Sequence, residues 1–319
     1  SLLGPETPIQ APPGRPAAEP AAIFAADDSA PQDTVTLLAA LRRRPSRDLE
    51  PSAAWLQRVA HHLVRPDAAN LLVALLRDLG LLQGPPLRPQ AREVPAFLAL
   101  PRAEVSRKLL RAWTDSTLWN DLAHVPGLDA AGKPWPNDPL VSRQMILGWL
   151  SDVPRGTWWD LKAFAAQIRE QHPGFQRPGG DFDAWYLRDS STGQFLRGFE
   201  GWEAIEGRLL RLVITGPLHW LGAIDLGAGT HEDPPTAFRT NPLFVQLTNG
   251  APAAEGGGSH HAASVQPDGR IVVPPDADPA HRYQIARWAA WEPREMDGYV
   301  YVITPRALEA AGKQGLRAG

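Results

Sequence analysis

Apolar residues recur at helical spacing through the first third of the chain. The pattern predicts three helices, the first capped by Asp33 and the third ended by Gly80. Two short apolar segments on either side of Gly84-Pro85 then predict a tight β-hairpin. Three helices followed by a hairpin form the order of elements in a winged helix.

A proline-rich segment follows, and beyond it the same order of elements recurs. Apolar spacing predicts three helices between residues 141 and 215, and then two strands joined by a wing-like loop between residues 223 and 239. The segment 172–201 carries several aromatic residues. We expect it to be an ordered insertion, because aromatic side chains are costly to leave in water.

The last segment of the chain changes pattern. Strands over residues 264–266 and 270–274 flank a Pro-Asp-Gly turn, and a helix follows from Asp278 to about Trp291. The alternating segment 299–303 predicts another strand, after which Thr304 caps a final helix. The predicted order is β-β-α-β-α.

These patterns together predict an α+β protein that is mainly helical, with two winged-helix units followed by a small C-terminal β-β-α-β-α module. The expected segments are an extended Pro/Ala-rich arm (1–32), winged-helix-like unit 1 (33–125), a linker (126–139), winged-helix-like unit 2 (140–250) with its insertion (172–201), a Gly/Ala linker (251–263) and the C-terminal module (264–319).

Composition excludes several classes of protein. The chain has 319 residues and no cysteine, which rules out disulfides, thiolate metal sites and cysteine nucleophiles. It has no apolar run long enough to span a membrane and no visible signal peptide, so we expect a cytoplasmic protein. Because the chain begins with Ser1 rather than Met, we expect it to be a piece of a longer protein.

Basic residues gather locally although the net charge is −3. Residues 42–65 hold six arginines and two acids, a local charge of +4, and residues 102–111 hold four cations and one acid, a charge of +3. A winged helix uses such cations on phosphates and its third helix on base edges. Residues 197–239 hold four arginines and six acids, a charge of −2, which is poorly suited to DNA. The expected DNA-phosphate contacts are Arg42, Arg43, Arg44, Arg47, Arg58, Arg65, Arg102, Arg107, Lys108 and Arg111.

No catalytic constellation stands out in the sequence. Residues 127–133 fit the beginning of a phosphate-binding loop, but Pro134 stands where a Ser or Thr must bind magnesium. No set of His, Asp and Glu residues has metal-ligand spacing, and no nucleophile elbow is found. We therefore expect a non-enzyme with no cofactor, no metal and no small-molecule substrate. A hydrolase with a divergent site stays open as a third alternative.

The twelve tryptophans allow two interpretations. In one, residues such as Trp158 and Trp291 are stacking platforms for nucleic-acid bases. In the other, tryptophans anchor small cores and domain interfaces. Their helical spacing with aliphatic partners favours the second interpretation.

The C-terminal module resembles a domain found beside helicases. Residues 265–269 read Val-Gln-Pro-Asp-Gly before a strand of Val and Ile, and residues 301–308 read Tyr-Val-Ile-Thr-Pro-Arg-Ala-Leu at the start of the last helix. This resembles the non-motor N-terminal (helicase-associated) domain of XPB-type repair helicases. More loosely, the upstream pattern is similar to the regions that precede this domain in bacterial helicase-associated proteins.

The resemblance implies a DNA-associated role in repair or transcription, with ATP-driven work done by a motor domain. The chain departs from the helicase pattern, since it has no intact Walker motif and no acidic ATPase box. The family has no catalytic residues in this region, so none is carried over. The motor would lie on a missing part of the chain or on a partner, or it was lost.

We expect the chain to be a non-catalytic DNA-binding or DNA-positioning accessory module of helicase-type DNA repair or transcription machinery. DNA and a helicase or other protein are the expected partners, with no membrane partner, and DNA binding would place the chain at the nucleoid. The alternative is a protein-protein interaction scaffold whose winged helices do not bind DNA. The acidic balance of winged-helix-like unit 2 favours that alternative.

Overall fold

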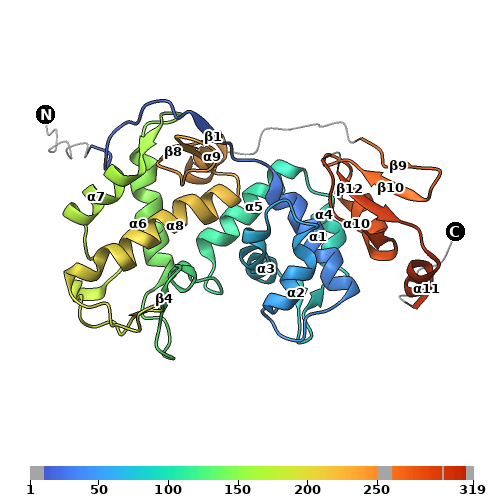
Figure 1. The fold of residues 1–319 in the computed structure, drawn as a ribbon, viewed down its shortest axis with the longest axis horizontal. Helices are drawn as coiled ribbons and strands as arrows, with labels where there is room; N and C mark the ends of the chain where they lie inside the picture. Colours follow the sequence, from blue (N-terminus) through green and yellow to red (C-terminus); the bar gives the residue numbers. More distant parts are fainter. Residues whose placement is uncertain (1–10, 250–260, 297, 314–319) are drawn as a thin grey trace, which may run out of the picture. The chain divides into compact units, whose positions relative to one another are not determined.

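The structure is a computed structural model, and it describes residues 11–249, 261–296 and 298–313 (Figure 1). The first ten residues of the expected arm and most of the expected Gly/Ala linker lie outside these ranges. The fold is α+β, with many helices and several small sheets, as the sequence predicts. Within the described ranges, no helix is both long and apolar enough to cross a membrane.

The chain forms two compact units, and neither is continuous in sequence. The first unit takes residues 1–26, 120–219 and 223–250, and the second takes residues 27–119, 220–222 and 251–319. The expected C-terminal module and the expected first winged-helix-like unit therefore lie in one compact unit. The sequence pattern gave no sign of this grouping, because the two segments are separated by more than a hundred residues.

The first unit holds fifteen described elements. They are β1 (Ala22–Phe24), η2 (Asp121–His124), β4 (Leu128–Asp129), α6 (Pro139–Asp152), β5 (Trp159–Asp160), α7 (Leu161–Gln171), η3 (Pro178–Gly180), β6 (Arg188–Asp189), η4 (Phe199–Gly201), the π-helical turn η5 (Glu203–Gly207), α8 (Arg208–Val213), the π-helical turn η6 (Ile214–Leu218), β7 (Ile224–Ala228), β8 (Ala237–Thr240) and α9 (Pro242–Asn249).

The N-terminal arm closes both edges of the main sheet of this unit. The strand order is β1-β7-β8-β5, and all pairs are antiparallel. β1 pairs with β7 at one edge, while the Ala17 amide donates to the Trp158 carbonyl (2.8 Å) at the other. Between these contacts the arm crosses β7 so closely that a Cβ on Gly227 would lie 2.5 Å from Pro20. The expected arm is therefore part of the fold.

A buried ion pair joins the insertion to the helix that follows it. Arg177 pairs with Glu206, and their side chains are 1% and 0% exposed. The Arg177 guanidinium also lies 4.4 Å from the centre of the Trp185 ring and donates to the Phe182 carbonyl (3.0 Å). Burial raises the pKa of Glu206, while Arg177 lowers it. This pair anchors part of the aromatic-rich insertion, including the buried Trp185. Tyr186, Phe195 and Phe199 are exposed, so burial of aromatic rings explains only part of the segment.

The second unit holds fourteen described elements. They are α1 (Ser29–Arg43), α2 (Ala53–Ala60), η1 (Pro66–Ala68), α3 (Ala69–Asp78), β2 (Leu82–Gln83), β3 (Arg88–Pro89), α4 (Glu93–Leu98), α5 (Arg102–Asp115), β9 (Ser264–Val265), β10 (Arg270–Val273), α10 (Pro279–Trp288), β11 (Ala290–Trp291), β12 (Tyr299–Val302) and α11 (Pro305–Lys313).

The first helix begins four residues before the predicted cap. α1 starts at Ser29, so the expected cap Asp33 lies inside the helix, fully buried. Pro31 hid this start in the sequence, although proline is tolerated in a first helical turn because its missing N–H has no helical partner there. The Asp33 carboxylate instead accepts hydrogen bonds from the Val64 and Arg65 amides (2.7 and 2.8 Å) and so fixes the loop after α2.

The end of α3 was predicted correctly. Gly80 has a φ of +69°, a left-handed conformation that glycine adopts at no steric cost. The Leu81 amide donates to the Leu76 carbonyl and the Gly80 amide to the Arg77 carbonyl, both at 2.9 Å. These two bonds form a Schellman motif, which turns the chain into the predicted β2-β3 hairpin.

The C-terminal segment forms an antiparallel sheet of order β11-β12-β10-β9 with α10 against it. The predicted helix ends at Trp288 rather than Trp291, and residues 290–291 add an edge strand. α10 packs on α1, where the buried Arg282 donates to the Gln32 carbonyl (2.7 Å) and to the Thr36 hydroxyl. Polar bonds therefore join elements 250 residues apart.

The Arg177–Glu206 pair predicts a large loss of stability when one partner is removed. Arg177→Met leaves a buried carboxylate unpaired, which should cost about 3–5 kcal/mol of unfolding free energy in urea titrations. The control is Arg188→Gln, which breaks the half-exposed pair with Asp129 and should cost less than about 1 kcal/mol. Equal losses would show that burial of the first pair has no special effect.

The buried Asp33 predicts a pH dependence of stability. Burial raises the pKa of Asp33 from 3.8 to about 6. The two backbone hydrogen bonds and Arg282 act in the opposite direction and lower this pKa. The folded state therefore binds this proton more tightly than the unfolded state does. The contribution of Asp33 to the unfolding free energy is fully present below about pH 4 and is lost as the pH rises through 6. Relative to Asp33→Asn, the wild-type chain should lose at most about 3 kcal/mol between pH 4 and 7 in urea titrations. Parallel pH profiles would contradict this assignment.

Candidate nucleic-acid-binding site

Five of the ten predicted phosphate contacts are engaged within the second unit. Arg65 pairs with Asp27, and Arg102 pairs with Asp28 and donates to the Pro275 carbonyl. The other engaged residues are Arg43, held by carbonyls of α10, Arg107, paired with Glu104, and Arg111, paired with Asp115. Arg43, Arg65 and Arg102 join separate segments of the fold, so they are poorly available for phosphates. Among the described residues, Arg107 and Arg111 pair only within α5.

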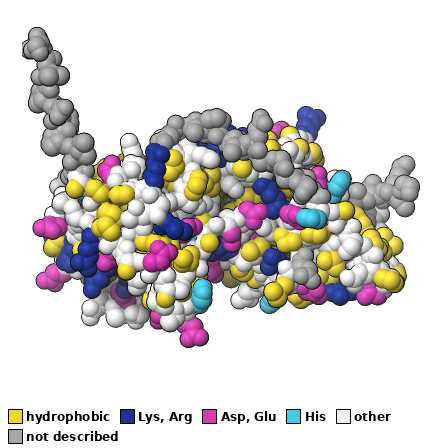
Figure 2. Space-filling model, turned by 90° about the horizontal axis from the view of Figure 1, so that it is seen from above, with side chains coloured by type: hydrophobic (Ala, Val, Ile, Leu, Met, Phe, Trp, Pro, Cys, Tyr) yellow, Lys and Arg dark blue, Asp and Glu magenta, His cyan; other side chains and the backbone are white. Residues whose placement is uncertain are grey.

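The other five cations form no hydrogen bond or ion pair through their side chains within the described residues. On the face shown in Figure 2, basic side chains alternate with acidic ones, so no single basic surface covers that face. Whether a phosphate can bind therefore depends on which of these cations lie close together rather than on how many there are. The five are Arg42, Arg44, Arg47, Arg58 and Lys108.

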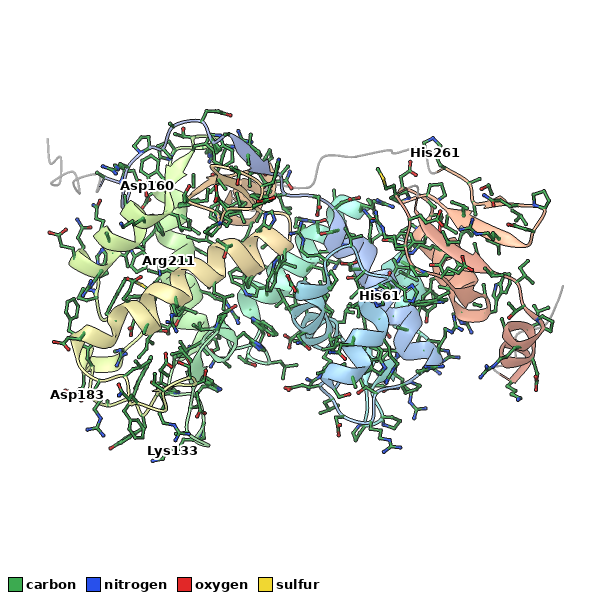
Figure 3. All side chains as sticks on the ribbon, viewed as in Figure 1. His61, Lys133, Asp160, Asp183, Arg211 and His261 are labelled. Carbon is green, nitrogen blue, oxygen red and sulfur yellow. The ribbon has the colours of Figure 1, made fainter. Side chains whose placement is uncertain are left out.

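Two of these cations, Arg44 and Arg58, line one cavity together with Arg43. The cavity has a volume of about 280 Å³ and lies where α1, α2 and β11 meet; His61 in Figure 3 marks the end of α2. No Asp or Glu of the described residues lines it. No residue of α5 lines it either, so the predicted cluster at 102–111 lies apart from this site. The remaining lining residues are Ala40, Trp55, Val59, His62 and Trp291.

Local sequence explains how the walls of the cavity form. Pro45 follows α1 and ends it, and Ser52 caps α2 by accepting a hydrogen bond from the Trp55 amide. The period of α2 then turns Trp55 and Val59 inward and leaves Arg58 exposed. The helix pattern thus places an aromatic wall and a cationic rim on one short helix.

Hydrogen bonds hold the tryptophan rings of the cavity in place. The Trp55 indole N–H donates to the Arg44 carbonyl (3.0 Å), and the Trp291 indole N–H donates to the Ala286 carbonyl (2.7 Å). The edge of the His62 ring meets Trp291 with 5.0 Å between ring centres. These rings are therefore positioned before any ligand arrives.

The charge of the cavity comes from its arginines. Arg43 donates to the Ala289 carbonyl (2.6 Å) at the end of α10 and lies 5.4 Å from the Trp291 ring centre. Burial lowers the pKa of Arg43, and burial also lowers the pKa of His62, which keeps the imidazole neutral at pH 7. The exposed guanidinium groups of Arg44 and Arg58 complete a site suited to a planar, anionic ligand.

Sequence reasoning missed the aromatic part of this site. The helical spacing of the tryptophans favours a role in the core for Trp291 rather than base stacking, and it does not single out Trp55. In the structure Trp55 is buried, whereas Trp291 is half-exposed. The only local signal for this site in the sequence is the spacing of Trp55 and Arg58, which lie one helical turn apart. The contribution of Trp291 depends on packing between distant segments.

Comparisons with protein-family models and with curated proteins find no match for this chain. The resemblance to the helicase-associated domain therefore stays a prediction. Among the described residues, no group of three or more His, Asp or Glu side chains lies close enough to hold a metal ion.

The contacts of Arg43 predict a structural role for this residue. Arg43→Met should lower the unfolding free energy by about 2–3 kcal/mol, because two carbonyls at the end of α10 lose a charged donor. The adjacent control Arg44→Gln changes an exposed side chain and should cost less than about 0.5 kcal/mol. Urea midpoints compare the two variants, and a larger effect of the control would contradict this assignment.

Proposed function

We propose that the chain is a non-catalytic DNA-binding or DNA-positioning accessory module, which contacts phosphates through the rim of the α1–α2 cavity. The observation that carries this proposal is the grouping of Arg44 and Arg58, whose side chains have no hydrogen-bond partner in the described residues, around a cavity with no acidic lining among those residues. Guanidinium groups suit phosphate because they form paired, charge-assisted hydrogen bonds. Arg47 is exposed in the loop between the two helices, but it does not line the cavity.

Strand pairing supports the winged-helix interpretation of both units. In the first unit, β5 lies between α6 and α7 and pairs with β8, the second strand of the hairpin. In the second unit, Ser46 lies between α1 and α2 and exchanges hydrogen bonds with Leu87, next to the second hairpin strand (3.2 and 2.7 Å). The same connection in both units is the one expected of winged helices.

The predicted recognition helix supports binding without base readout. In α3, all residues from Leu71 to Leu76 are buried, and its exposed side chains are those of Asn70 and Asp78. A helix that reads base edges must present several polar side chains to the major groove. We therefore propose that phosphate contacts dominate and that DNA sequence has little effect on affinity.

The association with a helicase-type machine rests on the C-terminal module. Its described strands and helices follow the order expected from the resemblance, with one added edge strand, β11. That added strand supplies Trp291 to the cavity. In this proposal the module positions DNA in the cytoplasm, at the nucleoid, for a motor on another chain or segment.

A double charge reversal tests this function. Arg44→Glu/Arg58→Glu should weaken binding to labelled duplex DNA in fluorescence anisotropy. The slope of log affinity against log salt should become shallower by about 1.8, because two phosphate contacts are lost.

The matched control is Lys108→Glu/Arg111→Glu, which makes the same change of charge on α5, away from the cavity. We expect a smaller loss of affinity from this control. Equal losses would mean that net charge alone drives binding, and a wild-type chain that does not bind at low salt would refute the function.

A protein-interaction scaffold is the second candidate, and a patch on the first unit favours it. Tyr186 and Phe195 are 52% and 46% exposed, and their rings meet edge to face. Lys133, labelled in Figure 3, lies 4.7 Å from the Tyr186 ring centre. Tyrosine, phenylalanine and arginine side chains are enriched at protein interfaces, and Arg197 lies 5.5 Å from the Phe195 ring centre.

A further inference from the structure

The proposed phosphate contacts use only the arginines at the rim of the α1–α2 cavity, and they give its aromatic walls no role. We propose that this cavity binds one unpaired nucleotide of a DNA strand, with the base inside and its phosphate at the Arg44–Arg58 rim. This inference rests on the proposed DNA-binding function and specifies the form of DNA that the site takes. Ends, forks and gaps would then be preferred over continuous duplex.

The size of the cavity selects a single planar group. Its volume of about 280 Å³ lies just below the range of about 300–1,000 Å³ found for small-molecule sites. A base within a duplex is stacked on both faces, so it cannot enter a cavity without leaving the helix. An unpaired base is already out of the duplex, so little free energy of unstacking and unpairing is needed for it to enter the cavity. The cavity therefore favours an unpaired base over a paired one.

The walls of the cavity suit an aromatic base. Trp55, His62 and Trp291 line it, and Trp291 and His62 are only half-buried, so part of their ring surface is accessible. Stacking of a base on an aromatic side chain contributes about 1–3 kcal/mol. His62 is neutral at pH 7 because burial lowers its pKa, so it adds a flat ring without another charge.

The lining offers few groups that could distinguish one base from another. Both indole N–H groups already donate to backbone carbonyls, those of Arg44 and Ala286. The other lining side chains are apolar, apart from the arginines and His62. The cavity therefore recognises that a base is unpaired rather than which base it is.

The rim supplies the second half of the recognition. Arg44 and Arg58 are exposed, and neither side chain forms an ion pair within the described part of the chain. Arg43 is committed to the carbonyls of α10, so it shapes the wall while its two neighbours remain available for a phosphate. Base and phosphate are thus recognised by different side chains, which can be changed separately.

The test compares two labelled DNAs with the same number of phosphates, a blunt duplex and a duplex with a short overhang. Fluorescence anisotropy with the wild-type chain should give about tenfold tighter binding to the overhang. A 2-aminopurine placed in the overhang should lose fluorescence on binding because it stacks, and the same base placed inside the duplex should not. The 2-aminopurine measurement uses the wild-type chain and does not depend on any variant.

A variant that fills the cavity locates the effect. Ala40→Met extends a side chain into the cavity from α1, and Ala54→Met makes the same change at an exposed position of α2. Ala40→Met should reduce the ratio of overhang affinity to duplex affinity to about one. Ala54→Met should behave as the wild-type chain.

The outcomes separate this inference from the proposed function. Equal affinity for the two DNAs, with a steep salt slope and no change in 2-aminopurine fluorescence, would overturn the inference and leave phosphate binding intact. No binding to either DNA would overturn both. A preference for the overhang that Ala40→Met leaves unchanged would also overturn the inference, because the effect would then lie outside the cavity.

Discussion

The packing of α10 on α1 is the interaction on which the second unit depends. Arg282 is buried there, donates to two groups of α1 and lies 3.5 Å from the centre of the Tyr299 ring. A buried cation needs hydrogen-bond acceptors close by, and the two acceptors on α1 hold the Arg282 guanidinium in one register between the two helices. Trp291 lies in β11, which follows α10, and its side chain lines the cavity. The position of Trp291 in the cavity therefore depends on the register between α10 and α1.

Three consecutive arginines at the end of α1 take three different roles. Neighbouring residues of a helix point about 100° apart, so a run of identical side chains meets different surroundings. Arg42 is half-buried beside Tyr283, Arg43 binds the end of α10, and Arg44 faces solvent at the cavity. A local sum of charges therefore overestimates the basic surface, because part of that charge stabilises the fold.

Much of the fold could be predicted from the sequence because its signals are local. The Gly80 motif and the alternating pattern of the C-terminal strands each depend on neighbouring residues. The start of α1 was misplaced because a proline in the first turn looks like a break. The grouping of the C-terminal segment with α1, and with it the cavity, was not predictable. It depends on bonds such as Arg282 to Gln32 that span 250 residues, for which apolar periodicity carries no signal.

The N-terminal arm has a consequence for the order in which the molecule is made. Residues 15–24 leave the ribosome before their partners in β5 and β7, which are synthesised about 140 and 200 residues later. Pairing between such distant segments is slow, because a long loop must close before any contact forms. Until β5 and β7 are synthesised the arm has no partner strand, although helices α1 to α5 already follow it in the chain. Its many prolines and scarcity of large apolar residues suit that interval, because they make it a poor partner for aggregation.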